Sequence, residues 1–342
     1  MRLFQKVSIY LLALCSLILS SLVLSLGPPE EMSQEQFDSL MTSISNWGRW
    51  GEDDQLGTLN TISLKKRIAA AELVSDGRSI SLSLPLNTVQ DEINAKPFEH
   101  TSYIFDHAEL EKLGMDASGL PLAAGDVYAI DYHGLGHSHI DAVSHVGYDG
   151  KMYNGYPYEN NGGKGFDNLG VEHIASEGIF TRGVLVDIPK MIGETSLTPG
   201  LAVTVQDLEA WEKYAGIKIS RGDILLLRTG RWKRIREEGT WNFAKTAAGF
   251  HASVARWLKE RDVAAIGSDG ISDVMPSGVS DRLNPLHELV IVGLGMPMFD
   301  NLYLEEVADF AKSSNRHTFL FIGLPLKAVG GTGSPFNPIA VF

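Results

Sequence analysis

The chain has 342 residues, of which 44% are hydrophobic and 21% charged, with 35 glycines and 14 prolines. This is the composition of an ordinary globular protein with enough apolar residues for a large core. The formal net charge is −13, and the acidic residues are scattered along the chain. Because the sequence has no basic stripe to neutralise phosphates, nucleic acid is excluded as a partner.

The N-terminus is different in kind from the rest of the chain. Arg2 and Lys6 precede an uncharged stretch, residues 7–26, that is rich in Leu, Ile and Val. A positive flank before an apolar run is typical of a secretory signal peptide, and a run of this length also suffices to span a bilayer. We therefore expect residues 1–26 to be either a cleaved signal peptide or an N-terminal membrane anchor.

In both cases the rest of the chain is exported from the cytoplasm, as a secreted, periplasmic or anchored protein. We expect residues 27–45 to form a polar N-terminal segment and residues 46–342 to form one domain. The only cysteine, Cys15, lies in the apolar run, so the exported domain has no disulfide. Its stability must come from its core, helped by metal binding and by assembly into a homo-oligomer, a dimer or tetramer.

Periodicity along the chain predicts alternating helices and short strands. Ser63 is a suitable N-cap for a helix, and Thr204 and Asp207 have the spacing of a capping pair before another. Short apolar runs bounded by polar residues are typical of buried strands. With no internal repeat or linker, the order of elements predicts one mixed α/β domain. The expected helices are 63–73, one after 204, and 253–261, and the expected strands are 79–85, 183–188, 223–228, 263–267, 317–326 and 338–342.

Five potential metal ligands occupy odd-numbered positions within one short stretch. Side chains alternate faces along a strand, so in an extended conformation all five would project to the same side. The apolar run at 127–132, which leads into this stretch, supports a strand. Imidazole and carboxylate groups converging on one point suit Zn²⁺ or Mn²⁺. The five residues are His133, His137, His139, Asp141 and His145.

A structural explanation of these residues is also open. A single histidine in a strand is usually a surface or hydrogen-bonded core residue, and Gly134 and Gly136 would allow a solvated loop. Unpaired polar groups stacked on one face would, however, cost about 1–3 kcal/mol each, which favours a metal centre. His287 and Asp300 flank an apolar segment further along and are candidates for two more ligands.

Other catalytic devices are missing from the sequence. There is no Gly-x-Ser-x-Gly nucleophile elbow, and the exported domain has no cysteine. The glycine-rich stretch 330–335 lacks the Gly-Lys-Ser/Thr ending of a phosphate-binding loop. Metal-activated water is therefore the expected attacking group.

The stretch His-Gly-x-x-x-Ser-His-x-Asp-Ala-x-x-His at 133–145 resembles the signature of the metal-dependent cyclase family. This family includes bacterial kynurenine formamidases, isatin hydrolase and trans-dienelactone hydrolase. The resemblance covers roughly residues 46–340 and is to a longer branch of the family. Further similar segments are Trp47–Trp50, Asp54–Asn60, Tyr148–Gly155, Leu227–Gly230, Gly267–Asp273 and Pro325–Lys327.

The resemblance implies a swivelling β/β/α fold with a mixed sheet, and a divalent ion, Mn²⁺ or Zn²⁺. By position, His139 and Asp141 match two ligands of the family, and His145 matches its proton-transfer histidine. The first ligand is displaced by two residues in this chain. His133 restores the match while keeping the same strand face, and His137 is its competitor.

The resemblance also concerns a second ion and the substrate. The family's second-metal ligands, a His and a Glu, correspond to His287 and Asp300, so both one ion and two remain open. Trp47, Trp50 and Tyr148 are candidates for an aromatic wall that binds a flat or cyclic small molecule, although they could equally be core residues.

The sequence therefore predicts an exported metal-dependent hydrolase that cleaves an amide, lactam or lactone with metal-activated water. In this hypothesis His133, His139 and Asp141 hold the ion, and His145 transfers the proton. Two alternatives remain open: a non-catalytic metal-binding or ligand-binding protein, and a metal-dependent lyase or isomerase.

Overall fold

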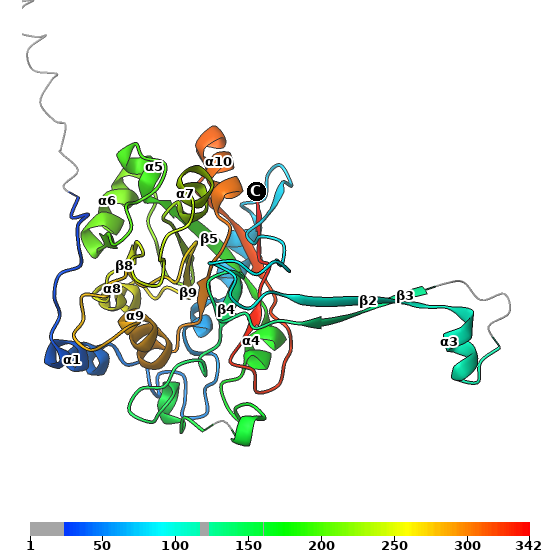
Figure 1. Cartoon of the computed structure of the whole chain (residues 1–342). Coiled ribbons are helices and arrows are strands. Elements are labelled where there is room, and N and C mark those ends of the chain that lie inside the picture. Colours follow the sequence, from blue (N-terminus) through cyan, green and yellow to red (C-terminus); the bar gives the residue numbers. More distant parts are fainter. Residues whose placement is uncertain (1–23, 117–122, 160) are drawn as a thin grey trace, which may run out of the picture.

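The computed structural model describes residues 24–116, 123–159 and 161–342 (Figure 1). Its centre is a nine-stranded mixed sheet with the order β1-β13-β11-β5-β7-β9-β10-β4-β12. The signal peptide or anchor expected at residues 1–26 lies almost wholly outside the described residues. No helix in the described ranges is both long and apolar enough to cross a membrane. The strands of the sheet are β1 (Ser79–Ser81), β4 (His139–Asp141), β5 (Ile179–Asp187), β7 (Ile224–Arg228), β9 (Ala265–Ser268), β10 (Met298–Asp300), β11 (Thr318–Gly323), β12 (Gly333–Pro335) and β13 (Ile339–Val341).

The middle of this sheet is parallel and its two ends are antiparallel. Strands β5, β7, β9 and β10 run parallel, while β11, β13 and β1 on one side and β4 and β12 on the other run antiparallel to their neighbours. The parallel strands are apolar and buried along their length, as expected for strands covered on both faces. The ligand strand β4 therefore lies near one end of the sheet, between β10 and β12.

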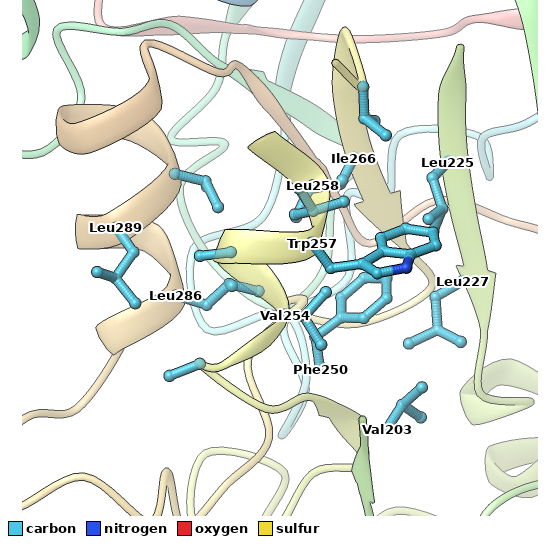
Figure 2. Packing of buried hydrophobic residues seen from close by; sticks show 14 of the residues in the cluster. Val203, Leu225, Leu227, Phe250, Val254, Trp257, Leu258, Ile266, Leu286 and Leu289 are labelled. Carbon is cyan, nitrogen blue, oxygen red and sulfur yellow. The ribbon is translucent and has the colours of Figure 1, made fainter. Parts of the chain in front are cut away.

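Helices cover both faces of the sheet. On one face, Leu225 and Leu227 of β7 belong to a cluster that also contains residues of α6, α8 and η4, part of which is drawn in Figure 2. On the other face, Ile224 and Leu226 belong to a cluster with residues of α4 and α10. Trp257 of α8 lies in the first cluster, close to these two leucines in the view. The helices are α1 (Gln34–Ile44), α2 (Leu64–Ala71), α3 (His107–Lys112), α4 (Val171–Glu177), α5 (Ile188–Ile192), α6 (Val205–Ala215), α7 (Arg231–Glu238), α8 (Val254–Glu260), α9 (Pro285–His287), α10 (Glu305–Ser314), the 3₁₀ turns η1 (Gly57–Thr61), η2 (Tyr153–Gly155) and η3 (Asn161–Gly163), and the π-helix η4 (Glu288–Leu294).

The expected secondary structure agrees with most of these elements. Ser63 caps α2 by accepting a hydrogen bond from the amide of Lys66 at 3.1 Å. At α6 the carboxylate of Asp207 accepts one from the amide of Thr204 at 2.9 Å. The mixed α/β, single-domain fold is confirmed.

Two expectations about segments are wrong. The segment expected to lie outside the domain contains α1, whose Phe37 and Ile44 are fully buried in the main core. The run 127–132 does not extend into the ligand strand. Instead, β3 (Ala123–Ala129) pairs only with β2 (Glu99–Phe105) in a separate hairpin that projects from the body, with α3 at its far end (Figure 1). A further small sheet pairs β6 (Ala202–Val203) with β8 (Gly249–Phe250).

Candidate metal centre

Strand β4 supplies the two central side chains of the site. His139 and Asp141 are two residues apart, so they project to the same face, while Ile140 between them is buried in the core on the other face. In the antiparallel pairing of β4 with β10, Asp300 lies directly opposite His139. Three potential ligands are therefore placed together by strand register alone.

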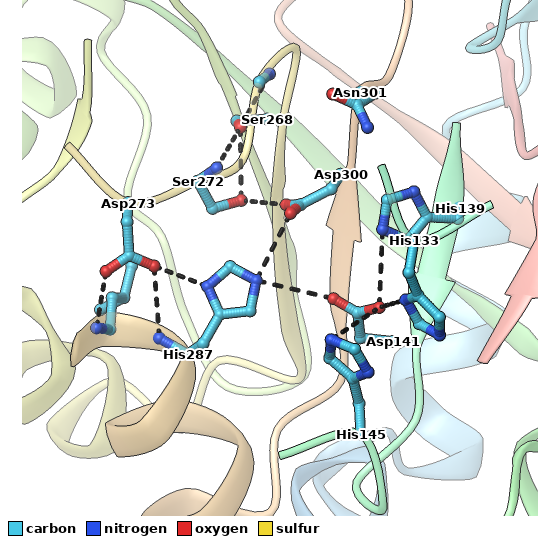
Figure 3. Close-up of polar contacts among 12 residues, drawn as sticks. His133, His139, Asp141, His145, Ser268, Ser272, Asp273, His287, Asp300 and Asn301 are labelled. Atoms are coloured by element: carbon cyan, nitrogen blue, oxygen red, sulfur yellow. Dashed lines mark hydrogen bonds and ion pairs between the residues drawn. The ribbon is translucent and has the colours of Figure 1, made fainter. Parts of the chain in front are cut away.

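His133 and His145 reach the same point from loops on either side of β4. Their imidazole rings are stacked, with centroids 4.0 Å apart and planes at 8° (Figure 3). His133 Nδ1 lies 3.0 Å from Asp141 Oδ1, and His145 Nε2 lies 3.9 Å from the same oxygen. The expected strand through all five candidates is wrong, because only residues 139–141 are extended in the ladder. His133, His139, Asp141 and His145 nevertheless converge on one point.

His137 is not part of this group. Its backbone carbonyl accepts a hydrogen bond from His139 Nδ1 at 2.9 Å, which turns His139 Nε2 towards Asp141 Oδ1, 3.6 Å away. The ring of His137 is buried elsewhere, and this burial lowers its pKa. Of the two candidates for the first ligand, the geometry thus brings only His133 to the centre.

His287 and Asp300 approach Asp141 from the opposite side. His287 Nε2 lies 3.4 Å from Asp300 Oδ2 and 3.6 Å from Asp141 Oδ2 (Figure 3). His287 ends α9, immediately before the π-helix η4; such helical irregularities frequently occur at functional sites. Within the described ranges, two groups of potential ligands therefore share Asp141: His133, His139 and Asp141, and Asp141, His287 and Asp300.

A second layer of polar contacts holds the ligands of the second group. Asp273 Oδ2 is 2.6 Å from His287 Nδ1, and Asp273 Oδ1 accepts the amide of Leu286 at 2.8 Å. Ser272 Oγ donates to Asp300 Oδ1 at 2.8 Å. These contacts orient His287 Nε2 and Asp300 Oδ2 towards Asp141. In the sequence, Ser272 and Asp273 stand out only as part of the stretch Gly267–Asp273 that carries the family resemblance, and neither has a predicted role.

The ionisable side chains of the centre shift one another's pKa. Burial alone would raise the pKa of Asp141, but the imidazoles of His145 and His139 outweigh it and hold that pKa well below its usual range. Burial alone would lower the pKa of His287, but its contacts with Asp141, Asp273 and Asp300 raise that pKa well above the usual value. Burial lowers the pKa of His145 to about 4. Asp141 is accordingly an ionised carboxylate surrounded by nitrogen donors.

A divalent cation fits these residues. Asp141 is 1% exposed, and neither of its carboxylate oxygens has a hydrogen-bond partner among the described residues; the same holds for His133 Nδ1. A buried carboxylate without hydrogen bonds is costly unless a cation compensates it. Two imidazole nitrogens with one carboxylate oxygen are typical ligands of a catalytic zinc or manganese ion that keeps a position open for other ligands.

The centre forms the floor of a cavity of about 560 Å³. Its polar lining comprises the ligand groups, His145, Asn284 and Glu288, and the carboxylate of Glu288 is paired with Arg282. Its apolar lining comprises Leu135, Val146, Ala244, Ile271, Met275 and Leu283. Trp241 and Phe243 belong to the apolar cluster that backs Leu135 and Ile271. This volume is in the range of sites for small molecules.

The three aromatic residues expected to bind substrate are not among the residues that line this cavity. The Trp47 indole donates to the carbonyl of Val292 at 2.7 Å, and Trp50 stacks against the guanidinium of Arg49. The Tyr148 hydroxyl donates to Asp38 at 2.6 Å. The side chains of Trp47 and Tyr148 thus tie loops to η4 and α1, respectively.

The fold and the centre define an α/β protein with a buried His/Asp cluster at the floor of an open cavity. The chain belongs to the Cyclase family, described as "Putative cyclase", whose model matches residues 80–273. A solved structure described as a novel cyclase has 30% sequence identity and a TM-score of 0.75, over 87% of this chain and 99% of that chain.

Two isatin hydrolases share the fold at lower identity. Isatin hydrolase A from Ralstonia solanacearum has 22% identity and a TM-score of 0.53, over 82% of this chain and 98% of its own. Isatin hydrolase A from Labrenzia aggregata, bound to benzyl benzoate, has 20% identity and a TM-score of 0.51, over 81% and 98%. No curated protein sequence matches the chain significantly.

Proposed function

We propose that this protein is a metal-dependent hydrolase that uses water to cleave an amide, lactam or lactone of a small, largely apolar substrate. The observation that carries the proposal is the convergence of two ligand groups on Asp141 at the floor of the cavity, with His145 beside them. Membership of the Cyclase family and the shared fold of two proteins named isatin hydrolases support the same reaction class.

In this proposal His133, His139 and Asp141 hold one divalent ion, and Asp141, His287 and Asp300 hold a second. When bound, the metal supplies Lewis-acid polarisation of the scissile carbonyl and lowers the pKa of the attacking water. Proton transfer and substrate binding depend on side chains that are not metal ligands.

His145 is the proton-transfer group. Its Nε2 lies 3.9 Å from Asp141 Oδ1, and its ring lines the cavity. It takes a proton from water as the oxygen attacks the acyl carbon, and it returns that proton to the leaving nitrogen or oxygen as the bond breaks. The products are a carboxylic acid and an amine or alcohol, which stay joined when the substrate is cyclic. The stacked ring of His133 keeps the imidazole of His145 in position.

The cavity walls bind the rest of the substrate. Leu135, Ile271 and Met275 offer apolar contact surface, and Asn284 offers an amide that can donate to or accept from a substrate carbonyl. A ring or an aryl group of a small acyl compound suits this lining.

The test uses the full chain loaded with Mn²⁺ or Zn²⁺ and a panel of aryl amides, lactams and lactones in ¹⁸O-labelled water. Hydrolysis requires one label atom in the acid product. His145→Ala should keep the metal content of the parent while kcat falls about 10²–10⁴-fold. Turnover without ¹⁸O incorporation would indicate a lyase or isomerase, and equal turnover in parent and variant would remove His145 from the mechanism. Metal binding with no turnover of any panel member would favour the non-catalytic alternative.

A further inference from the structure

The loop 133–138 leads into β4 and begins with a ligand of the first group, yet it belongs to no strand. It contains Gly134 and Gly136, so its backbone depends on outside contacts to hold one conformation. Three of its carbonyl groups accept hydrogen bonds from two buried side chains of the body, Asn301 and Arg231. These two side chains therefore determine where the loop lies.

Asn301 follows directly after β10 and is fully buried (Figure 3). Its Nδ2 donates to the carbonyl of Gly134 at 2.6 Å and to that of His137 at 3.2 Å. Its Oδ1 accepts a hydrogen bond from Arg231 Nη1 at 2.6 Å. Its backbone has a φ of +56°, in the left-handed region that asparagine tolerates better than most residues. The position thus needs a residue that adopts this conformation and donates twice, and asparagine does both.

Arg231, the first residue of α7, is also buried, and its Nη2 donates to the carbonyl of Leu135 at 2.7 Å. The guanidinium lies over the rings of Trp232 and Phe243, 4.4 and 4.0 Å from their centroids. Its hydrogen bonds go to neutral acceptors and, among the described residues, to no carboxylate. A buried charge without an ionic partner is costly, so stability alone does not account for Arg231.

The contacts of Asn301 act on both histidine ligands of the first group. Gly134, whose carbonyl it binds, is joined directly to His133. The carbonyl of His137, which it also binds, accepts the hydrogen bond from His139 Nδ1 at 2.9 Å. Asn301 therefore fixes the backbone beside one ligand and the acceptor that orients the other. Contacts of this kind maintain the affinity of a metal site.

We propose that Asn301 and Arg231 are positioning residues of the first metal site, which hold the loop 133–138 so that His133 and His139 face Asp141. The second site does not depend on them, because its ligands are oriented by hydrogen bonds from other side chains. This inference rests on the metal centre of the proposed function, and its test is the binding of each ion.

The first variant is Asn301→Asp, which keeps the size of the side chain, its tolerance of the left-handed backbone and an acceptor for Arg231. It lacks both N–H donors and places a carboxylate oxygen against two carbonyl groups. In calorimetric titration of the metal-free full chain with Mn²⁺ or Zn²⁺, one ion should bind about 10–100-fold more weakly and the other as in the parent. The matched control is Asn315→Asp, at an exposed left-handed position after α10, and it should bind both ions as the parent does.

A double variant identifies which ion is lost. His287 is a ligand of the second group only, so His287→Ala should keep the first ion. Asn301→Asp combined with His287→Ala should then bind neither ion at concentrations that saturate the parent. One ion bound tightly by the double variant would show that Asn301 does not support the first site, and would overturn the proposal.

Arg231→Lys tests the second positioning residue, since lysine keeps the charge but cannot form two hydrogen bonds in a fixed fork. It should weaken the same ion by about 10-fold and keep the circular dichroism spectrum of the parent. Equal weakening of both ions in either single variant would mean general support of the fold and would overturn the proposal. Unchanged binding of every ion in Asn301→Asp would overturn this inference alone, whereas a parent that binds no metal would overturn the proposed function as well.

Discussion

The shared carboxylate of Asp141 leads to a quantitative prediction about metal content. Asp141 Oδ1 faces His133 and His139, whereas Oδ2 faces His287. Asp300 takes part only in the second group. Asp141→Asn should therefore abolish both ion sites, while Asp300→Asn should remove one and leave the other.

The expected effect on stability follows from mass action. At metal concentrations about 100-fold above the dissociation constant, each occupied site stabilises the folded chain by about 2.7 kcal/mol. For a chain of this size 1 kcal/mol corresponds to about 2 °C in Tm. Adding Mn²⁺ or Zn²⁺ to the metal-free parent should raise its Tm by about 10 °C. The same addition should raise the Tm of Asp300→Asn by about half as much and leave the Tm of Asp141→Asn almost unchanged.

Elemental analysis and thermal unfolding check this together. The parent should hold two equivalents of metal, Asp300→Asn one and Asp141→Asn none. Asp309→Asn, at an exposed position of α10, is the control and should behave as the parent. A parent with one equivalent that Asp300→Asn retains would refute the second site. Metal bound by Asp141→Asn at the parent's level would refute the central role of this carboxylate.

Two further predictions concern buried carboxylate contacts. Asp273→Ala removes the acceptor that holds His287 Nδ1 at 2.6 Å, so the affinity of the second site should fall about 10–100-fold while the first site keeps its ion. Metal titration followed by calorimetry distinguishes this from equal loss at both sites. Arg228→Ala removes a buried guanidinium that joins two carboxylates at 3.0 and 2.8 Å, and it should lower the free energy of unfolding by about 3–5 kcal/mol. Urea unfolding measures the second effect, and a loss below about 1 kcal/mol would show that these carboxylates do not depend on Arg228.

The elements that could be predicted from the sequence are those determined by local chemistry. The apolar run 223–228 corresponds to β7, and the pair Thr204 and Asp207 starts α6 as its spacing indicates. The single-face argument for His139 and Asp141 holds because both lie in β4. It failed for His133 and His145, which reach the centre from loops.

The rest of the site depends on contacts between distant segments. His287 and Asp273 are 14 residues apart and meet through the loop before α9, while Asp300 faces His139 only because β10 pairs with β4. Periodicity reports on one element at a time and contains no term for such pairings. The family resemblance at 133–145 helped here because the family pattern also includes ligands that are distant in the sequence, which correspond to His287 and Asp300. Export, by contrast, depends on residues 1–26, most of which lie outside the described ranges, and stays a prediction.

The aromatic residues illustrate the limit of reasoning from residue type. Trp47 and Tyr148 have the chemistry of a substrate-binding wall. Their polar groups nevertheless donate hydrogen bonds to residues in helices, Trp47 to Val292 of η4 and Tyr148 to Asp38 of α1. Both side chains have a hydrogen-bond partner within the protein, and such partners fix loops as readily as they bind ligands. The cavity instead takes its apolar surface from aliphatic side chains such as Ile271, with Phe243 in the cluster behind them. Substrate selectivity should therefore depend on the shape of this aliphatic wall, more than on aromatic stacking.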